Sequence, residues 1–204
     1  MVRRSTPGPY GPEYFDKWYR HPRHRVATAA DVRRRAALAL GIAEWVLGRA
    51  VRSVLDVGCG EAPWRAALRS MRPRIRYTGV DASPYVVQRH GRRRGIRLGT
   101  FGALDAAVDD GPYDLIVSVD VLHLIDAREV ARGLRAVRER MGGVAYLSAF
   151  TSADAFEGDV RAVRRRAPSW YRARFRNAGL VPVGLECFVT RDLLPRLAAL
   201  ERAP

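Results

Sequence analysis

The chain of 204 residues has little cysteine, almost no lysine and no long apolar run. Its two cysteines, Cys59 and Cys187, show neither disulfide nor metal-ligand spacing, which predicts a protein of the reducing cytoplasm. The longest apolar stretch, residues 36–43, is too short to span a bilayer. The first residues carry no apolar run, so the sequence predicts neither a signal peptide nor a membrane partner.

Lysine is represented only by Lys17, yet the formal net charge is +15, so nearly all of the positive charge is arginine. A basic chain attracts nucleic acid, anionic lipid or acidic metabolites. The arginines recur along nearly every expected helix, at 33–35, 65–69, 92–94, 132–140 and 161–166. This spread is typical of solvated helix faces rather than of one binding stripe, so the charge permits a nucleic-acid partner without favouring one.

Strands and helices alternate along most of the chain. Residues 1–27 are rich in proline, glycine and aromatic residues without a period, which predicts an irregular arm. A helix capped by Asp31 follows. Strands are then expected at 51–57, 75–80, 96–98, 115–119 and 144–150. This alternation predicts an α/β fold with a doubly wound, mostly parallel sheet and helices on both faces.

Caps and glycines mark the ends of the expected helices. Ser83 opens one helix and Gly91 closes it. Asp126 begins a capping box for another, which Gly142 and Gly143 stop. After residue 150 only one strand is convincing, at 180–189, followed by a last helix within 191–202. The sheet should therefore have six or seven strands, within one domain at 28–204.

Ligands of such sheets bind at the carboxyl ends of the strands, where the strand order reverses. The turns there read D-V-G-C-G, D-A-S-P, G-T-F-G-A-L and D-V-L-H. Gly58 and Gly60 lack the third glycine of a dinucleotide loop, and the acids Asp56 and Asp120 would repel a pyrophosphate. Asp81 can accept ribose hydroxyls. A positively charged nucleoside without phosphate fits these turns, and S-adenosylmethionine is such a molecule.

The segments "VLDVGCGEA", "YTGVDASP", "YDLIVSVDVLHLI" and "FRNAGL" resemble the successive motifs of class I S-adenosylmethionine-dependent methyltransferases, from about Val54 to Leu180. The resemblance implies a Rossmann-like sheet of seven strands, the last antiparallel, and an enzyme that transfers a methyl group. It also implies a set of cofactor-binding residues: Asp56, Gly58 and Gly60 at the methionine end, Asp81 and Ala82 at the ribose, and Asp120 and Val121 nearby.

One segment departs from this family. Its members often carry an acid on the adenine amine after the third strand, whereas the segment here is "LGTFGALDA". We expect the ring of Phe101 to pack on the base instead, with the backbone of Gly102, Ala103 and Leu104 bonding its edge.

Candidate residues for the acceptor side have two interpretations each. His123 follows the fourth strand and could act as a general base, because an imidazole titrates near neutral pH; alternatively it packs against the next helix or bonds a carbonyl. Trp18 and Tyr19 could belong to a lid over the site or staple the arm to the domain. Trp170 is a further candidate for contact with the substrate.

Two patterns near the end of the chain are explained by ordinary helix structure, and we prefer this explanation to a functional one. Asp154, Glu157 and Asp159 suggest the start of a helix more than a metal cluster, so no metal is expected. The segment "RRRAPSWYRARF" interleaves basic and aromatic residues as nucleic-acid binders do, yet Ser169 as a cap makes it an ordinary amphipathic helix.

The sequence thus predicts a cytoplasmic methyltransferase that acts on an oxygen or nitrogen of a small molecule, a metabolite or natural product. The arm and residues 151–170 are expected to cover the acceptor. Two alternatives remain: an RNA methyltransferase, which the charge permits, and a non-catalytic module that binds S-adenosylmethionine only as a ligand.

Overall fold

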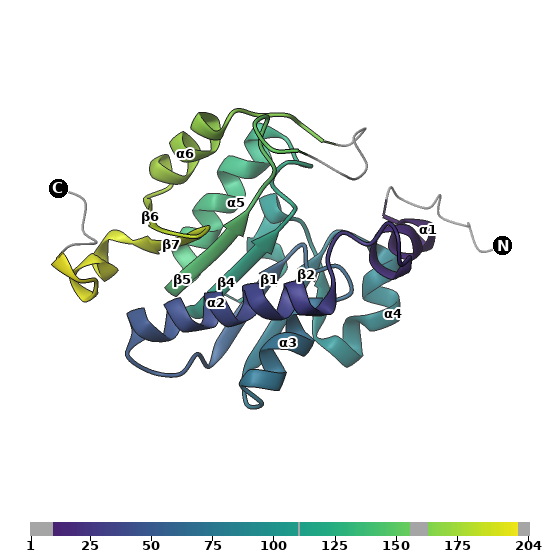
Figure 1. Ribbon diagram of the computed structural model, residues 1–204, viewed down its shortest axis with the longest axis horizontal. Coiled ribbons are helices and arrows are strands. Elements are labelled where there is room, and N and C mark those ends of the chain that lie inside the picture. Colours follow the sequence, from purple (N-terminus) through teal and green to yellow (C-terminus); the bar gives the residue numbers. More distant parts are fainter. Residues whose placement is uncertain (1–9, 110, 156–162, 200–204) are drawn as a thin grey trace.

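The computed structural model describes residues 10–109, 111–155 and 163–199. A seven-stranded sheet forms its centre, in the order β3-β2-β1-β4-β5-β7-β6 (Figure 1). The strands are β1 (Ser53–Val57), β2 (Arg76–Asp81), β3 (Ile96–Leu98), β4 (Tyr113–Val119), β5 (Met141–Ser148), β6 (Leu180–Gly184) and β7 (Cys187–Thr190). Strands β1 to β5 pair in parallel, and β7 is antiparallel to both of its neighbours. The predicted doubly wound, mostly parallel sheet is confirmed.

The hairpin β6–β7 replaces the single strand expected at 180–189, and this expectation was wrong. The turn between the two strands has Leu185 at φ 50° and Glu186 at φ 64°. Left-handed backbone is usually supplied by glycine or asparagine, so a Leu-Glu turn inside an apolar run carries no sequence signal.

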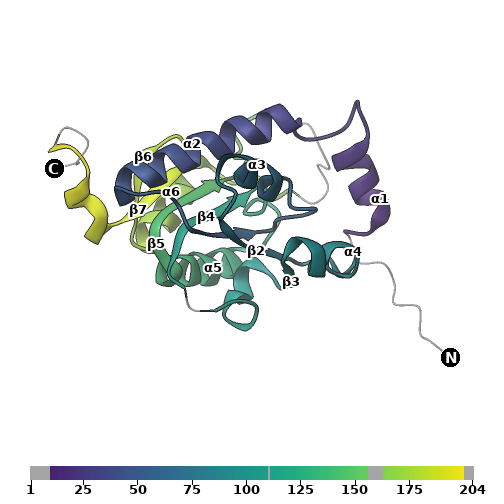
Figure 2. The same ribbon diagram turned by 90° about the horizontal axis from the view of Figure 1, so that it is seen from below.

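Helices cover both faces of the sheet (Figures 1 and 2). They are α2 (Ala29–Leu47), α3 (Pro63–Met71), α4 (Pro84–Arg94), the 3-10 helix η2 (Phe101–Ala106), α5 (Ala127–Arg140), α6 (Pro168–Asn177) and the 3-10 helix η3 (Arg191–Arg196). Helices α2 and α3 share one apolar core with the sheet, and η2, α5 and α6 share another. None of the described helices has the length and apolar character of a membrane span.

Several helix ends differ from the expected ones. The cap of α2 is Thr28, whose hydroxyl accepts the Asp31 N–H. The Asp31 carboxylate accepts the Thr28 N–H in turn, so Asp31 is the third residue of the helix and the partner of Thr28 in a capping box. Helix α4 ends at Gly95, which has φ 69°, and not at Gly91 as expected. Gly91 is a buried residue inside the helix and packs against the Ile96 carbonyl. Helix α6 begins after Ala167.

Other ends agree with the sequence or end earlier than expected. Ser83 caps α4 by accepting the Val86 N–H, and Asp126 caps α5 by accepting two backbone N–H groups. Helix α5 stops at Arg140, so Gly142 and Gly143 belong to β5 rather than to a helix stop. The expected last helix is the short η3, and residues 200–204 lie outside the described residues.

The described arm is helical at residues 12–20 and irregular at 10–11 and 21–27, so the expectation of an irregular arm was wrong only for residues 12–20. It forms α1 (Pro12–Phe15) and the π-helix η1 (Asp16–Arg20). Phe15 is 2% exposed, in an apolar cluster with Cys59 and Val86. Both ribbon views place α1 beside α4. Aromatic packing, which periodicity does not report, holds this segment on the domain.

Candidate active site

The strand order reverses between β1 and β4, and three loops meet at the carboxyl ends of β1, β2 and β4. The N–H groups of Gly58 and Cys59 donate to the Val80 carbonyl at 2.8 and 3.1 Å. A Cβ on Gly58, which has φ 73°, would come within 2.1 Å of Val121 Cγ2. The loops after these strands therefore lie against one another, as the predicted site requires.

Asp81 joins the second loop to the first. Its Oδ2 accepts the Gly60 N–H at 2.7 Å and its Oδ1 accepts the Ser83 N–H at 2.8 Å. Burial raises the pKa of Asp81, and the two backbone bonds oppose that rise. Each carboxylate oxygen has a second lone pair, so the group can still accept hydroxyl groups of a ligand. Ala82 beside it is exposed.

Asp56 lies beneath the glycine loop rather than on its surface. Its side chain is buried, and its Oδ2 accepts the Tyr77 hydroxyl at 2.6 Å. Burial raises the pKa of Asp56 to about 7, which the Tyr77 hydrogen bond limits. Cys59 is also buried, and burial raises its pKa well above the usual range, so its thiol is a filler between loop and sheet.

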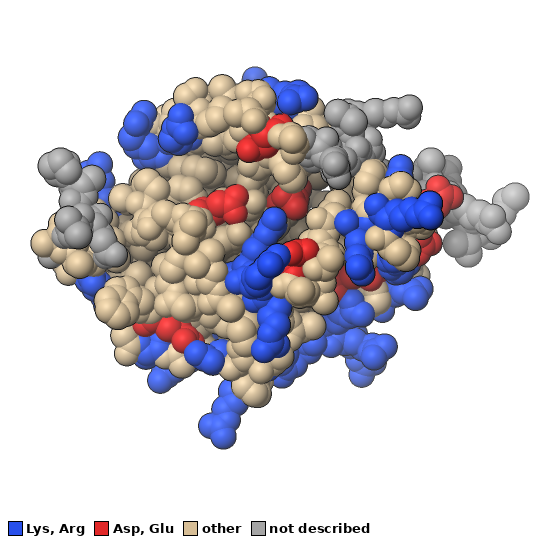
Figure 3. Space-filling view, viewed as in Figure 1, with Lys and Arg blue, Asp and Glu red and all other residues tan. Residues whose placement is uncertain are grey.

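Asp120 is the residue of the third loop whose carboxylate stays open to the site. It has φ 59°, a left-handed conformation that costs about 1–2 kcal/mol for a residue with a Cβ. Burial raises its pKa to about 6, Arg35 lowers it and Glu186 raises it. Among the described residues its carboxylate has no hydrogen-bond or ion-pair partner. Figure 3 shows acidic residues near the middle of one face of the molecule, with basic residues beside them and over much of the remaining surface.

The arm brings Tyr19 over the glycine loop. A Cβ on Gly60 would meet the Tyr19 hydroxyl at 2.3 Å, so this ring fills the space above Gly60. Burial raises the pKa of Tyr19 well above its usual value, and the charges of Asp81 and Asp120 raise it further. Tyr19 therefore lies against the glycine loop, and its contact with a substrate stays a prediction.

The Trp18 side chain contacts other residues of the arm. Its ring contacts His24 edge-on at 6.3 Å between centroids, and Lys17 Nζ lies 4.5 Å from the ring. These contacts hold the arm together and do not place Trp18 with the three loops.

The expectation for Phe101 was wrong. Its ring is 2% exposed and packs against α5, where a Cβ on Gly133 would meet it at 2.0 Å. No face of the ring is presented to a base. Gly102 lies against Glu129, and Ala103 is exposed, so their backbone remains a candidate for the adenine edge.

His123 is buried in the loop after β4. Its Nδ1 accepts the Phe150 N–H at 3.3 Å, and its carbonyl accepts the Arg164 N–H at 2.8 Å. Burial and the charge of Arg166 lower its pKa to about 4, so it is neutral at pH 7. These contacts match the structural interpretation of His123, and its role as a base stays a prediction.

Trp170 is held between two arginines of its own segment. The guanidinium carbons of Arg166 and Arg174 lie 4.3 and 5.0 Å from its ring centre. Both guanidinium groups come from the same segment as the ring, so its basic and aromatic residues contact one another. Contact of Trp170 with a substrate stays a prediction.

The segment 151–170 is described only at its ends. Arg166 donates to the Leu122 and Ile125 carbonyls at 3.0 and 2.7 Å, which ties the segment to the loop after β4. Asp154 accepts from the Thr151 hydroxyl and N–H at 2.8 Å, whereas Glu157 and Asp159 lie outside the described residues. The described residues contain no group of three side chains that could hold a metal.

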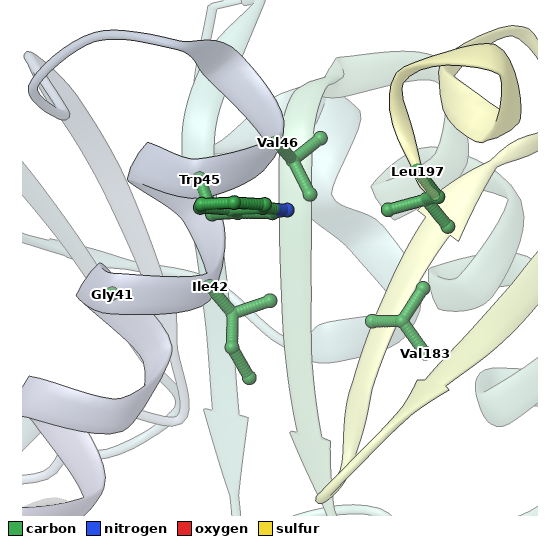
Figure 4. A pocket seen from close by; sticks show the side chains of 6 residues that line it. All are labelled: Gly41, Ile42, Trp45, Val46, Val183 and Leu197. Atoms are coloured by element: carbon green, nitrogen blue, oxygen red, sulfur yellow. The ribbon is translucent and has the colours of Figure 1, made fainter. Parts of the chain in front are cut away.

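A second hollow lies elsewhere on the molecule, between α2 and the end of the chain. Its lining is apolar: Gly41, Ile42, Trp45, Val46, Val183 and Leu197. Figure 4 shows Trp45 edge-on on α2, with Val183 and Leu197 across the hollow. Residues 41–46 lead toward the start of β1, so this hollow lies away from the carboxyl ends of the strands.

The donor set at the strand ends fits S-adenosylmethionine. Gly58 carries no side chain where the first and third loops meet, Asp81 can accept ribose hydroxyls, and the negative charge of Asp120 suits a sulfonium. Fold and site together are those of a class I S-adenosylmethionine-dependent methyltransferase. The family model described as a methyltransferase domain matches residues 19–199, and the chain belongs to that family.

Solved structures share this fold at low sequence identity. DesVI of Streptomyces venezuelae has a TM-score of 0.61 at 16% identity, covering 79% of this chain and 91% of its own. The sugar N-methyltransferase KedS8 of Streptoalloteichus sp has a TM-score of 0.62 at 21% identity, covering 94% and 98%. The plantazolicin methyltransferase BamL, solved with S-adenosylhomocysteine, has 0.60 at 15% identity, covering 81% and 73%. A search of curated proteins found no match.

Sequence reasoning missed Arg35 and Glu186, which lie near Asp120, and Tyr77, which bonds Asp56. Arg35 and Glu186 stand outside the quoted motifs, and Tyr77 opens "YTGVDASP" at the start of its strand, four residues before Asp81. Arg35 is one of several arginines on α2, and Glu186 lies in the unexpected hairpin turn, so no local signal distinguishes them.

Proposed function

We propose that this enzyme methylates an oxygen or nitrogen of a small-molecule acceptor, a metabolite or natural product, in the cytoplasm. The observation that carries the proposal is the position of Tyr19 over Gly60, because an arm that lies on the glycine loop covers surface that a long RNA would otherwise contact. The names of two structural neighbours, a sugar N-methyltransferase and the plantazolicin methyltransferase, support a small acceptor by analogy of fold alone.

The residues of the site would have different roles in the reaction. S-adenosylmethionine supplies a methyl group already activated on sulfur, so the protein mainly positions the reactants. Asp81 would hold the ribose while bonding the glycine loop. Tyr19 and the arm would exclude water from the methyl group, and a base is needed only where the acceptor carries a proton to lose.

The first prediction concerns the ligand. We expect S-adenosylhomocysteine to bind, and NAD and NADP not to bind, because the loop ends are acidic and the third glycine of a dinucleotide loop is absent. Titration calorimetry with each ligand measures this. NAD binding with no response to S-adenosylhomocysteine would contradict the proposed function.

We also propose that the described part of the arm is a lid over the cofactor. Four contacts support this: Phe15 is buried between loop and α4, Arg20 pairs with Glu61, Arg20 Nη2 lies 3.2 Å from the Tyr85 hydroxyl, and the Ser83 hydroxyl donates to the Tyr10 carbonyl at 2.6 Å. These contacts lie beside the loop that ends at Gly60.

The second prediction follows from the lid. Phe15→Ala should loosen the arm, since removing a buried phenylalanine side chain costs about 3–5 kcal/mol. The result should be faster dissociation of S-adenosylhomocysteine, measured by stopped-flow fluorescence. Val26→Ala is the matched control, because Val26 belongs to the same arm and is 55% exposed. Equal dissociation rates in the two variants would refute the lid.

A further inference from the structure

We propose that Asp120 contacts the methyl acceptor and that this acceptor is an amine, methylated on nitrogen. The proposal rests on the proposed function and narrows it to a substrate class. In it, the carboxylate of Asp120 holds the nitrogen by a hydrogen bond and takes the proton that the nitrogen loses after methylation.

The position of Asp120 is the first support. It directly follows β4, the strand beside β1 at the point where the strand order reverses, and its N–H donates to the Ser148 carbonyl on the next strand at 3.3 Å. Its left-handed backbone sets its side chain apart from the line of β4. The next residue, Val121, lies against Gly58 of the glycine loop, so Asp120 stands beside that loop from the neighbouring strand.

Asp120 belongs to a group of charged residues that we call the wall, which also contains Arg35 and Glu186. Arg35 comes from α2 and Glu186 from the β6–β7 turn, and both act electrostatically on Asp120. Glu186 is held in place, because its Oε2 accepts the Tyr146 hydroxyl at 2.7 Å and its carbonyl accepts the Leu147 N–H at 2.9 Å. This group thus holds two carboxylates and one guanidinium, so its formal charge is negative.

This charge balance separates nitrogen from oxygen acceptors. A neutral amine becomes positively charged as it is methylated, and neighbouring carboxylates stabilise that charge. A hydroxyl acceptor must develop negative charge on oxygen, which the same carboxylates destabilise. The wall therefore favours an amine.

The reaction balances with the groups named. The nitrogen lone pair forms the new N–C bond while the C–S bond breaks and its electron pair stays on sulfur. The methylated nitrogen, now positively charged, passes one proton to the Asp120 carboxylate, which releases it to water. Burial and Glu186 raise the pKa of Asp120 to about 6, so the carboxylate is mostly ionised and ready to accept at pH 7.

The experiment uses matched acceptors on the full chain with S-adenosylmethionine. Glucosamine is compared with glucose and cyclohexylamine with cyclohexanol, by the rate of S-adenosylhomocysteine formation. The variants are Asp120→Asn, Glu186→Gln and His123→Gln. Asp109→Asn is the control, because the Asp109 side chain is 86% exposed and lies in another loop. Calorimetry with S-adenosylhomocysteine reports whether each variant keeps its cofactor site.

We expect the amine of at least one pair to react in clear preference to its hydroxyl partner. Asp120→Asn should lower kcat/KM for that amine by about 100-fold or more while S-adenosylhomocysteine affinity changes little. Glu186→Gln should lower it less, and Asp109→Asn should not. Preference for the hydroxyl partner, an unchanged Asp120→Asn, a loss confined to His123→Gln, or no reaction with any probe although S-adenosylhomocysteine binds would overturn the proposal. Failure to bind S-adenosylhomocysteine would instead overturn the proposed function.

Discussion

Replacing Asp81 with alanine should lower the affinity for S-adenosylhomocysteine by about one to two orders of magnitude. A hydrogen bond to a charged group is worth about 1.5–3 kcal/mol, which corresponds to that loss. The carboxylate has two tasks, because it also accepts the N–H groups of Gly60 and Ser83. The variant should therefore lose some stability as well as affinity, and both are measurable, by calorimetry and by thermal unfolding.

Asp81→Asn separates the two tasks. The amide oxygen can still accept one backbone N–H, whereas the negative charge is lost and the amide nitrogen cannot accept the other. We expect its affinity to fall between those of the wild type and Asp81→Ala. An Asp81→Ala protein that binds S-adenosylhomocysteine as tightly as the wild type would contradict the assignment of Asp81 to the ribose.

Replacing Gly58 with alanine should damage both the fold and the cofactor site. Gly58 has φ 73°, where a residue with a Cβ loses about 1–2 kcal/mol. The new Cβ would also stand 2.1 Å from Val121 Cγ2 and 3.3 Å from Val121 Cβ, so the first and third loops must separate. Overpacking of this kind costs about 1–3 kcal/mol more. Cofactor affinity should fall by more than about tenfold, because the shifted loops form the site.

Gly41→Ala is the matched control for this variant. Gly41 is an exposed residue of α2, and a Cβ added there meets nothing within 4 Å. Alanine in a helix is about 0.5–1 kcal/mol more favourable than glycine, so this variant should be neutral or slightly more stable. Urea unfolding compares the two proteins. Similar unfolding midpoints for Gly58→Ala and Gly41→Ala would show that the loops do not need a glycine at 58.

Local sequence patterns predicted the parallel part of the sheet well. Apolar runs bounded by glycine, proline and capping residues mark β1 to β5, and the caps Ser83 and Asp126 start the helices they were expected to start. These features depend on neighbours within a few residues, so periodicity and capping chemistry report them. The antiparallel hairpin was not predicted, because Leu185 and Glu186 adopt left-handed backbone at its turn without a glycine or asparagine.

Side-chain directions were less predictable than strands. Phe101 lies in the segment expected to meet the adenine, yet its ring turns into the core against Gly133, a residue about thirty positions away that leaves room for it. The arm gave no periodic signal, although aromatic contacts such as Phe15 with Tyr19, at 4.9 Å between ring centroids, hold it in helical form. Such contacts arise between segments and leave no mark on either one alone.

The sequence by itself determined which loops meet at the candidate site. The glycine loop, Asp81 and Asp120 follow strands in a fixed order, and parallel strands bring their carboxyl ends to one edge of the sheet. Only the tertiary structure decided which charged residues surround Asp120. Arg35 comes from α2 and Glu186 from the β6–β7 turn, some 150 residues apart in the chain. They lie near Asp120 because α2 packs across the sheet and the β6–β7 hairpin forms one edge of that sheet. Charge balance in that space depends on packing, and no local pattern in the chain records it.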